Sequence, residues 1–414
     1  MKILFVCQYF YPEVFRGNDI AFHWAEDGHD VHVVTGIPNY PDGKFHKGYG
    51  LFERRYEEIV HPSAGSGTET FKGRVLVTRL PIVPRGNNKI MLMLNYFSYL
   101  IVAWVYILFH ALTHKYDRVF VQQLSPVMMS APGVLYKRIR KVPLYTWVLD
   151  LWPESLTAAG GINNKYVLAF FRHYVKSQYK HSDKILTSSR SFENSILEYG
   201  NYKDKIVYFP QWSDGNDGAM VVPGNAPVIP EGFKLMFAGA VGEAHGFECT
   251  MKAALLTKEH KDIKWIIVGD GRKLDWVKEF VKVNDLEETV LTLGRFPAVT
   301  MPWFFNQADV MLVTLNDDPL FKLYAPAKIS SYMAAAKPIV AVLNGEGSEV
   351  IKDANCGWCL PAGDSEGFAK LAIELSQLNK EVLKEKGQNS LNYYNEHFVK
   401  EKCLRKLDKL MGIA

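Results

Sequence analysis

Short apolar runs alternate with helical segments along the chain in two separate series. In the first, an apolar run at residues 2–10 leads through a turn at 16–18 to a helix at 19–26 and a second apolar run at 31–35. Continuous apolar runs of this length are typical of strands buried on both faces of a parallel sheet. Strand, glycine turn, helix and strand form the opening of a doubly wound nucleotide-binding fold. No GxGxxG follows, so a dinucleotide site is not indicated.

The second series begins at Phe233. Apolar runs at 265–268, 290–293 and 310–314 alternate with helical segments. Residues 210–230, between the two series, are rich in Gly, Asp, Asn and Pro, as in a domain linker. At 414 residues the chain has room for two domains of about 200 residues each. The sequence therefore predicts an α/β protein with two Rossmann-like domains facing each other across a cleft.

Residues 324–342, YAPAKISSYMAAAKPIVAV, contain a candidate anion site. The stretch predicts a loop, a helix at about 327–336 and a strand at 338–342. Ala327 and Lys328 would lie in the first helical turn, where free N–H groups and the positive helix end suit a phosphate. An ordinary helix of an α/β domain that binds nothing explains the same residues equally well.

Two acids follow a predicted strand at 144–149. Asp150 comes directly after it, and Glu154 lies in the next turn, in DLWPES. An acid at the carboxyl end of a parallel strand is where a substrate-facing group would lie. Capping of the following helix is the alternative role for either residue.

Glycine and loop segments offer weaker hints in the first series. Gly17 would let a ligand approach the backbone, although a plain turn is an equally good reading. The segment 36–50, GIPNYPDGKFHKGYG, predicts an irregular loop, and loops at the carboxyl ends of parallel strands often carry function. A second, polar loop is expected at 61–70.

Composition and cysteine placement exclude several classes of protein. A formal net charge of +4 is too small to indicate a nucleic-acid partner. Five scattered cysteines form no disulfide framework. Cys356 and Cys359 make a single CxxC, for which buried or strand-end thiols are favoured over a zinc or redox site. The chain enters a strand directly, without a signal peptide, so we expect a cytoplasmic protein.

The most apolar stretch, residues 90–112, is long enough to span a bilayer. Three polar residues interrupt it and two basic residues precede it: Asn95, Ser98, His110, Arg85 and Lys89. A domain helix that partly contacts a membrane surface is favoured over a wholly internal helix. A true span is disfavoured because it would divide one α/β domain across the membrane.

Motifs along nearly the whole chain carry a resemblance to one family. They are YFYPE at 9–13, GHDVHVVTGIPNYPDGKFHKGY at 28–49, DLWPES at 150–155, FAGAVGEAHGFE at 237–248, VGDGRK at 268–273, LGRFP at 293–297, ADVMLVTL at 308–315 and PAKISSYMAAAKPIVA at 326–341. They resemble the family 4 glycosyltransferases of the two-Rossmann GT-B architecture. Within that family, the chain is similar to bacterial surface-polysaccharide enzymes of the colanic-acid and N-acetyl-L-fucosamine transferase type.

The resemblance implies domain bounds and roles. We expect an acceptor-binding domain at 1–210, a linker at 211–230, a nucleotide-sugar domain at 231–385 and a final helical segment at 386–414 that crosses back to the first domain. The implied reaction is retaining sugar transfer from a nucleotide sugar, UDP-linked in our expectation, without metal or other cofactor.

The implied acceptor is a lipid-linked saccharide of surface-polysaccharide, capsule or O-antigen biosynthesis. Peripheral membrane contact through 85–112, on the inner face of the cytoplasmic membrane, would then follow.

The resemblance also gives candidate site residues. Asp150 and Glu154 are the candidate catalytic residues, with Asp150 matching a position close to the transferred sugar. In the family, the base lies near the position of Gly294 and Arg295, and the diphosphate lies on the helix start at Ala327 and Lys328. The candidate donor-binding residues are Gly17, Gly239, Gly242, His245, Gly269, Arg272, Gly294, Arg295, Tyr324, Ala327, Lys328 and Ser331.

Three departures from the family pattern matter. Two family glutamates match Leu323 and Ser331, so the acidic ribose contact is weakened or replaced. The Arg and Lys that are common in the glycine loop of the family match Ala240 and His245 here. The charge of the diphosphate would then be met by Lys328, Arg272, Arg295 or backbone amides. The helix after Gly17 is short for the family.

Two alternative functions therefore stay open. One is a catalytically silent GT-B subunit. The other is a GT-B-like nucleotide-sugar 2-epimerase, for which no acid/base set is evident.

Overall fold

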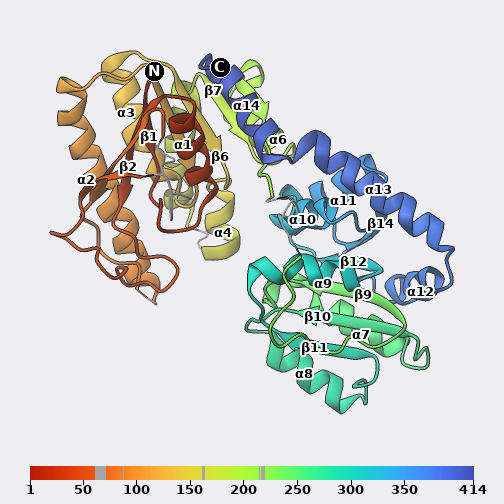
Figure 1. The fold of residues 1–414 in the computed structure, drawn as a ribbon. Helices are drawn as coiled ribbons and strands as arrows, with labels where there is room; N and C mark the ends of the chain where they lie inside the picture. The colour runs from red at the N-terminus through yellow and green to blue at the C-terminus, as the bar shows by residue number, and fades with distance from the viewer. Residues whose placement is uncertain (61–70, 87, 161–163, 214, 216–219) are drawn as a thin grey trace. The chain divides into compact units, whose positions relative to one another are not determined.

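The computed structural model describes residues 1–60, 71–86, 88–160, 164–213, 215 and 220–414. The polar loop expected at 61–70 lies outside them. The chain divides into two compact units, Met1–Phe209 together with Leu404–Ala414, and Pro210–Cys403 (Figure 1).

The described part of the first unit holds an eight-stranded sheet in the order β3-β4-β2-β1-β5-β6-β7-β8. All neighbouring strands are parallel except β3 and β4, which are antiparallel. The strands are β1 (Lys2–Val6), β2 (Asp30–Gly36), β3 (Tyr56–Ile59), β4 (Arg74–Leu80), β5 (Arg118–Gln123), β6 (Leu144–Val148), β7 (Lys184–Thr187) and β8 (Ile206–Tyr208). The helices are α1 (Arg16–Glu26), α2 (Lys89–Thr113), η1 (Val127–Ser130), α3 (Ala131–Arg140), α4 (Glu154–Gly160), α5 (Lys165–His181), α6 (Phe192–Leu197) and η2 (Lys203–Lys205).

The described part of the second unit holds a six-stranded, all-parallel sheet in the order β11-β10-β9-β12-β13-β14. The strands are β9 (Phe233–Ala238), β10 (Ile263–Val268), β11 (Val290–Gly294), β12 (Val310–Thr314), β13 (Ile339–Val342) and β14 (Gly357–Leu360). The helices are η3 (Glu243–His245), α7 (Phe247–Leu256), α8 (Leu274–Val283), η4 (Ala298–Thr300), α9 (Met301–Gln307), η5 (Phe321–Leu323), α10 (Lys328–Ala334), α11 (Glu346–Asp353), α12 (Ser365–Ser376) and α13 (Lys380–His397). A last helix, α14 (Lys400–Met411), runs from the second unit into the first.

Each unit is doubly wound, as the sequence predicts. The order of the second sheet is the dinucleotide-fold order 3-2-1-4-5-6, and the first sheet contains the same order within its eight strands. Alternate residues of β9 face opposite sides of the sheet. Leu235 and Phe237 join an apolar cluster with α7, α8 and α12. Met236 and Ala238 join another with α9 and α10. Strands covered on both faces explain the continuous apolar runs.

Several local expectations differ from the structure. The turn expected at 16–18 is wrong, because α1 already begins at Arg16 and Gly17 is buried within it. β3, α5, α11 and β14 were not predicted. β3 has the polar sequence YEEI and pairs only along one edge with β4, so it lacks the apolar run of a buried strand.

The two neighbouring cysteines are structural in their placement. Cys356 is buried directly before β14, and Cys359 lies within that strand. Both are free thiols, and their sulfurs approach the carbonyl oxygens of Ile351 (3.7 Å) and Ser348 (3.6 Å). Burial raises the pKa of Cys356 to about 11. A buried thiol of this kind is unreactive at neutral pH, in agreement with the favoured reading of the CxxC.

Helix α2 buries one stripe and exposes another. Its buried residues are Asn95, Tyr99, Ala103, Ile107, His110 and Ala111. Its exposed apolar residues are Ile90, Met93, Leu94, Phe97, Ile101, Trp104, Val105, Phe109 and Leu112. The wholly internal reading is therefore wrong. Among the described helices, α2 alone is long and apolar enough to cross a membrane by length and composition.

The end of the chain packs on the first unit. Asp408 is buried, and its two carboxylate oxygens accept hydrogen bonds from Trp24 Nε1 (3.0 Å) and pair with His23 Nε2 (2.8 Å). Arg405 forms an ion pair with Asp27, at the end of α1. Leu404–Ala414 belong to the first unit, whereas α13 lies within the second.

Candidate functional site

In the second unit, backbone hydrogen bonds tie together the carboxyl ends of three adjacent strands. Gly239 N donates to Val268 O (2.9 Å), and Gly269 N donates to Gly294 O (2.8 Å). Gly239 and Gly269 directly follow β9 and β10, and Gly294 ends β11. Three of the candidate donor-binding glycines, which lie far apart in the sequence, are thus brought to one edge of the sheet.

Close approach explains why two of these positions are glycine. Gly269 has φ +147°, and a Cβ there would lie 1.8 Å from Gly239 O. Gly239 has φ +141°, and a Cβ there would lie 3.2 Å from Lys328 Nζ. The missing side chain at Gly239 leaves room beside the lysine amine, so small groups can approach both the backbone and the amine.

Lys328 carries a buried amine without a partner. No described residue accepts a hydrogen bond from its Nζ, which lies 3.7 Å from the centre of the Phe237 ring. Burial lowers the pKa of Lys328 to about 7. A buried cation costs free energy unless it is paired, so this amine is poised to receive an anion.

His245 lies beside the same group. It ends η3, and its Nδ1 is buried with no partner among the described residues. Burial, followed by repulsion from Lys328, lowers the pKa of His245 to about 4. The imidazole is therefore neutral at pH 7 and adds a polar contact rather than a charge. Gly242 lies next to it: a Cβ there would be 3.5 Å from Nδ1.

The loop carrying His245 is fixed to the neighbouring strand. Thr314 Oγ1, at the end of β12, donates to His245 O (2.5 Å), and Asn316 N donates to Ala244 O (3.0 Å). β9 and β12 are the pair at which the strand order reverses. Ligands of doubly wound sheets bind outside the carboxyl ends of the strands at this point.

The remaining candidate donor-binding residues are exposed or only partly buried. Arg272 and Arg295 are exposed, the first after the glycine turn that follows β10 and the second directly after β11. Ala327 is exposed before α10, whereas Tyr324 and Ser331 are partly buried. Glu346, which the sequence did not single out, is buried at the start of α11, beyond β13.

In the first unit, Asp150 and Glu154 have different neighbours. Burial raises the pKa of Asp150, and hydrogen bonds from Ser125 oppose that rise. Burial also raises the pKa of Glu154, whose surroundings include Arg172 and Tyr199. Asp150 lies just beyond β6, and Glu154 begins α4.

Gly17 owes its lack of a side chain to packing. A Cβ there would lie 2.1 Å from Gln122 Oε1 and 3.0 Å from Phe5 Cζ. Gly17 therefore lets α1 lie close to β1 and β5. These two strands flank the point at which the first sheet reverses its order.

A polar cluster near Asp150 was not predicted. Arg85 Nη1 donates to Tyr9 Oη (2.9 Å), and its guanidinium lies over the rings of Tyr40 (5.5 Å) and Tyr96 (5.9 Å). Burial is the main cause of the raised pKa of Tyr96, and the negative charge of Asp150 raises it further. The sequence feature that could have indicated this cluster is Arg85, a basic residue shortly before the apolar helix.

One group of described residues has the spacing of metal ligands. Ligand atoms of His23, Asp27 and Asp408 all lie within 4.8 Å of one another. Arg405 pairs with both carboxylates, however, so its positive charge already occupies the place that a cation would take. We assign these residues to docking of the chain end rather than to a metal site.

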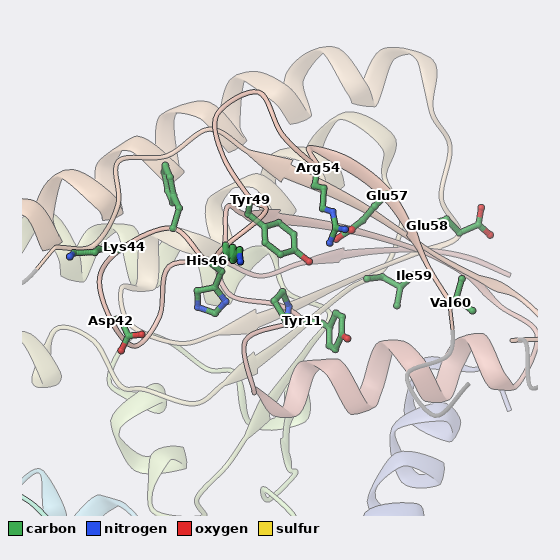
Figure 2. A pocket seen from close by; sticks show the side chains of 13 residues that line it. Tyr11, Asp42, Lys44, His46, Tyr49, Arg54, Glu57, Glu58, Ile59 and Val60 are labelled. Carbon is green, nitrogen blue, oxygen red and sulfur yellow. The ribbon is translucent and has the colours of Figure 1, made fainter. Parts of the chain in front are cut away.

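The first unit also contains an open cavity of about 870 Å³, shown in Figure 2. Its walls come from the segment after β1, the loop at 42–49 and the segment 54–60 that contains β3. In Figure 2, Tyr11, His46 and Tyr49 surround its middle, Asp42 and Lys44 lie toward one end, and Glu58 and Val60 toward the other. The sequence had marked the loop but not the cavity.

Two family models match most of the chain. Residues 17–212 match the "Glycosyl transferase 4-like domain", and residues 232–377 match "Glycosyl transferases group 1". The probable glycosyltransferase WbjE of Pseudomonas aeruginosa is 30% identical over 278 residues, covering 64% of this chain and 69% of that protein. The chain is a family 4 glycosyltransferase.

Other comparisons agree with the family. The putative colanic acid biosynthesis glycosyl transferase WcaI of Escherichia coli is 24% identical over 60% of this glycosyltransferase and 59% of that protein. The crystal structure of Anabaena HepE in complex with UDP aligns with TM-score 0.65 at 14% identity, covering 100% of each chain. The latter likeness supports the GT-B fold predicted from the sequence.

Proposed function

We propose that this glycosyltransferase moves a sugar from a UDP-linked donor to a lipid-linked saccharide in surface-polysaccharide biosynthesis, with retention at the anomeric carbon and without a metal ion. One observation carries the donor assignment: the buried, unpartnered Lys328 amine beside Gly239, at the carboxyl ends of β9 and β12. A diphosphate would supply the charge that this amine lacks.

Names of similar proteins support the finer parts of the proposal. WbjE and WcaI are described as glycosyltransferases, the second in colanic acid biosynthesis. HepE was crystallised with UDP. Exposed Arg272 and Arg295 flank the same strand ends and would meet the outer phosphate and the base.

The chemistry of transfer fits these groups. Cleaving the glycosyl–phosphate bond builds negative charge on the leaving diphosphate. Lys328, in charged form, and nearby backbone N–H groups would stabilise that charge in a water-poor setting. His245, neutral at pH 7, would donate or accept a hydrogen bond.

In the scheme we propose, the acceptor attacks on the face of the leaving group, and a phosphate oxygen takes the acceptor proton. Asp150 and Glu154, with pKa values raised by burial, would orient sugar or acceptor hydroxyls in this scheme. Ser331 and Tyr324 would line the sugar and ribose.

The lipid-linked acceptor is supported by the surface of α2. Its exposed apolar residues repeat along the helix, with Ile101 60% and Phe109 65% exposed. Arg85 and Lys89 lie at its start, and basic residues there would favour an anionic membrane surface. Contact with the membrane would hold the enzyme where lipid-linked saccharides reside.

A ligand panel tests the proposal. Thermal unfolding of the full chain is followed with UDP, GDP and dTDP and their sugars, since a ligand stabilises the state that binds it. Stabilisation by UDP compounds, absent in Lys328→Ala, supports the donor assignment. No shift with any nucleotide would favour a catalytically silent subunit, and formation of an epimer instead of a glycoside would favour an epimerase.

A further inference from the structure

Strand β9 continues beyond its pairing with β12. Within the described part of the second sheet, the last pair that joins the two strands is Met236 opposite Met311. On the other side of β9, pairing with β10 continues as far as Ala238, which lies opposite Val268. The end of β9 therefore lacks a strand partner on the β12 side, where the strand order of the sheet reverses.

One side chain of α10, Tyr332, takes the place of the missing strand partner. Gly239 N donates to Val268 O on β10, so the N–H and C=O groups of Ala238, one residue earlier, point to the β12 side. The Tyr332 hydroxyl accepts a hydrogen bond from Ala238 N (3.0 Å) and donates one to Ala238 O (2.8 Å). A single hydroxyl thus satisfies both backbone groups that the neighbouring strand leaves unpaired.

Burial and packing hold Tyr332 in this position. The residue is 1% exposed, and its ring packs edge-on against Phe305 of α9, with ring centres 5.3 Å apart. Burial raises the pKa of Tyr332, so the hydroxyl keeps its proton and can donate and accept at once. The link between α10 and β9 is therefore present throughout the neutral pH range.

The same link sets the place of the Lys328 amine. Lys328 and Tyr332 are four residues apart on α10, so they lie on one face of the helix. Lys328 Nζ lies 3.7 Å from the centre of the Phe237 ring and 3.2 Å from the place that a Cβ of Gly239 would take. The hydroxyl contact with Ala238 thus joins α10 to the middle residue of the segment 237–239, whose first and last residues flank the amine.

Helix α10 depends on such contacts for its position. It has seven residues, and a helix of this length is not stable by itself in water. A binding group must be held within about 0.5 Å of its productive position by packed and hydrogen-bonded neighbours. The two hydrogen bonds of Tyr332 supply such support one helical turn after Lys328.

We propose that Tyr332 is a positioning residue for donor binding: its hydroxyl fixes α10 to the end of β9 and thereby holds the Lys328 amine where it meets the diphosphate. The inference rests on the proposed function, in which Lys328 receives the diphosphate of the donor. It deepens that function by naming the residue that positions this lysine. Tyr332 is buried and acts through Lys328 rather than by touching the donor.

The test compares the binding of UDP and of uridine to the full chain. Tyr332→Phe removes the hydroxyl and keeps the ring. We expect it to weaken UDP affinity about tenfold, because a displaced amine meets the diphosphate less well. Uridine affinity should stay unchanged, since uridine has no diphosphate. Calorimetric titration measures UDP binding, and ligand-observed NMR measures uridine binding.

Tyr394→Phe is the matched control. It removes another buried hydroxyl of the second unit, which donates to Ser213 O (3.2 Å). Both variants should unfold at lower temperature than the wild type, because each leaves a backbone group without its partner. Only Tyr332→Phe should lose UDP affinity. Calorimetry gives the number of sites separately from the affinity, so a loss of folded protein is not mistaken for weaker binding.

The outcomes separate this inference from the proposed function. Wild-type UDP affinity in Tyr332→Phe overturns the positioning role and leaves the transferase proposal standing. An equal loss of UDP and uridine affinity also overturns it, because the hydroxyl would then support the shape of the unit in general. If UDP does not bind the wild type, both proposals fail, since the Lys328 amine would have no diphosphate to receive.

Discussion

Trp24 Nε1 donates a hydrogen bond to Asp408 Oδ1 across 3.0 Å, joining residues 384 positions apart in the chain. Asp408 is 1% exposed. Replacing it with alanine leaves Trp24 and His23 without their acceptor, and loss of a buried charged partner costs about 2–4 kcal/mol. We expect Asp408→Ala to lower the unfolding midpoint of the first unit in urea. Glu401→Ala, an exposed acid on the same helix, should leave the midpoint unchanged; equal effects would show that the contact is not stabilising.

Lys328→Met should have opposite effects on stability and on binding. The variant removes a buried amine without a partner, so the ligand-free protein should gain about 1 kcal/mol or more of stability. It should also lose the thermal stabilisation that UDP gives. Differential scanning calorimetry with and without UDP reads both effects. A variant that is less stable and still binds UDP would contradict the assignment.

The pKa of Lys328 gives a pH dependence with a defined sign. In the free folded protein this pKa is about 7, below the ordinary 10.5. Between these values the unfolded chain binds more protons than the folded one. The free energy of unfolding therefore rises with pH in this window, as far as this group is concerned.

A bound diphosphate would raise the pKa of Lys328, so binding above pH 7 should take up a proton. UDP affinity should then fall as pH rises from 7 to 9, and calorimetry in buffers of different ionisation enthalpy should show proton uptake. A UDP-sugar, which lacks the terminal phosphate ionisation of UDP, is the control for titration of the ligand. If its affinity does not fall over the same pH range, the effect belongs to the ionisation of UDP and not to Lys328.

Asp150→Asn tests the acid beyond β6. Its carboxyl group hydrogen-bonds with Ser125, and the amide keeps the shape of the side chain while removing its charge. We expect transfer to fall by about 10²-fold or more, with unchanged unfolding temperature and UDP binding, the cost of losing an orienting group near the reaction. Full activity would remove Asp150 from the site.

The apolar face of α2 is testable apart from catalysis. The double variant Ile101→Glu/Phe109→Glu places charges on exposed positions, so folding should be unaffected. We expect co-sedimentation with vesicles containing anionic lipid to fall at least tenfold. Ile101→Leu/Phe109→Leu is the control that keeps the apolar surface. Equal sedimentation of both double variants would argue against membrane contact through this face.

Strand positions could be predicted because most strands of both sheets are buried on two faces. KILFV and VMLVT, in β1 and β12, are continuous apolar runs with few other structural solutions. Parallel order then brings their carboxyl ends to one edge, which is why glycines predicted from separate loops meet there. β3 was not predicted because it is an edge strand, and an edge strand does not require a continuous apolar run.

Burial and long-range pairing could not be predicted from local sequence. The sequence marked Lys328 as a cation near a helix start. It did not indicate that the Lys328 amine would be buried against the Phe237 ring, with no hydrogen-bond acceptor among the described residues. Likewise, Arg79 lies in an ordinary strand sequence, and its contact with Tyr49 depends on how the loop after β2 folds. Such partners are chosen by tertiary packing rather than by spacing along the chain.

The first unit is built from both ends of the chain, since Leu404–Ala414 pack on a body formed by Met1–Phe209. During synthesis, His23 and Trp24 on α1 therefore lack their partner Asp408 until the ribosome has made the entire second unit. A chain cut before Leu404 would keep every candidate site residue and still lack the acceptor that His23 and Trp24 require. The stability of the part that is made first thus depends on residues that follow the entire second unit.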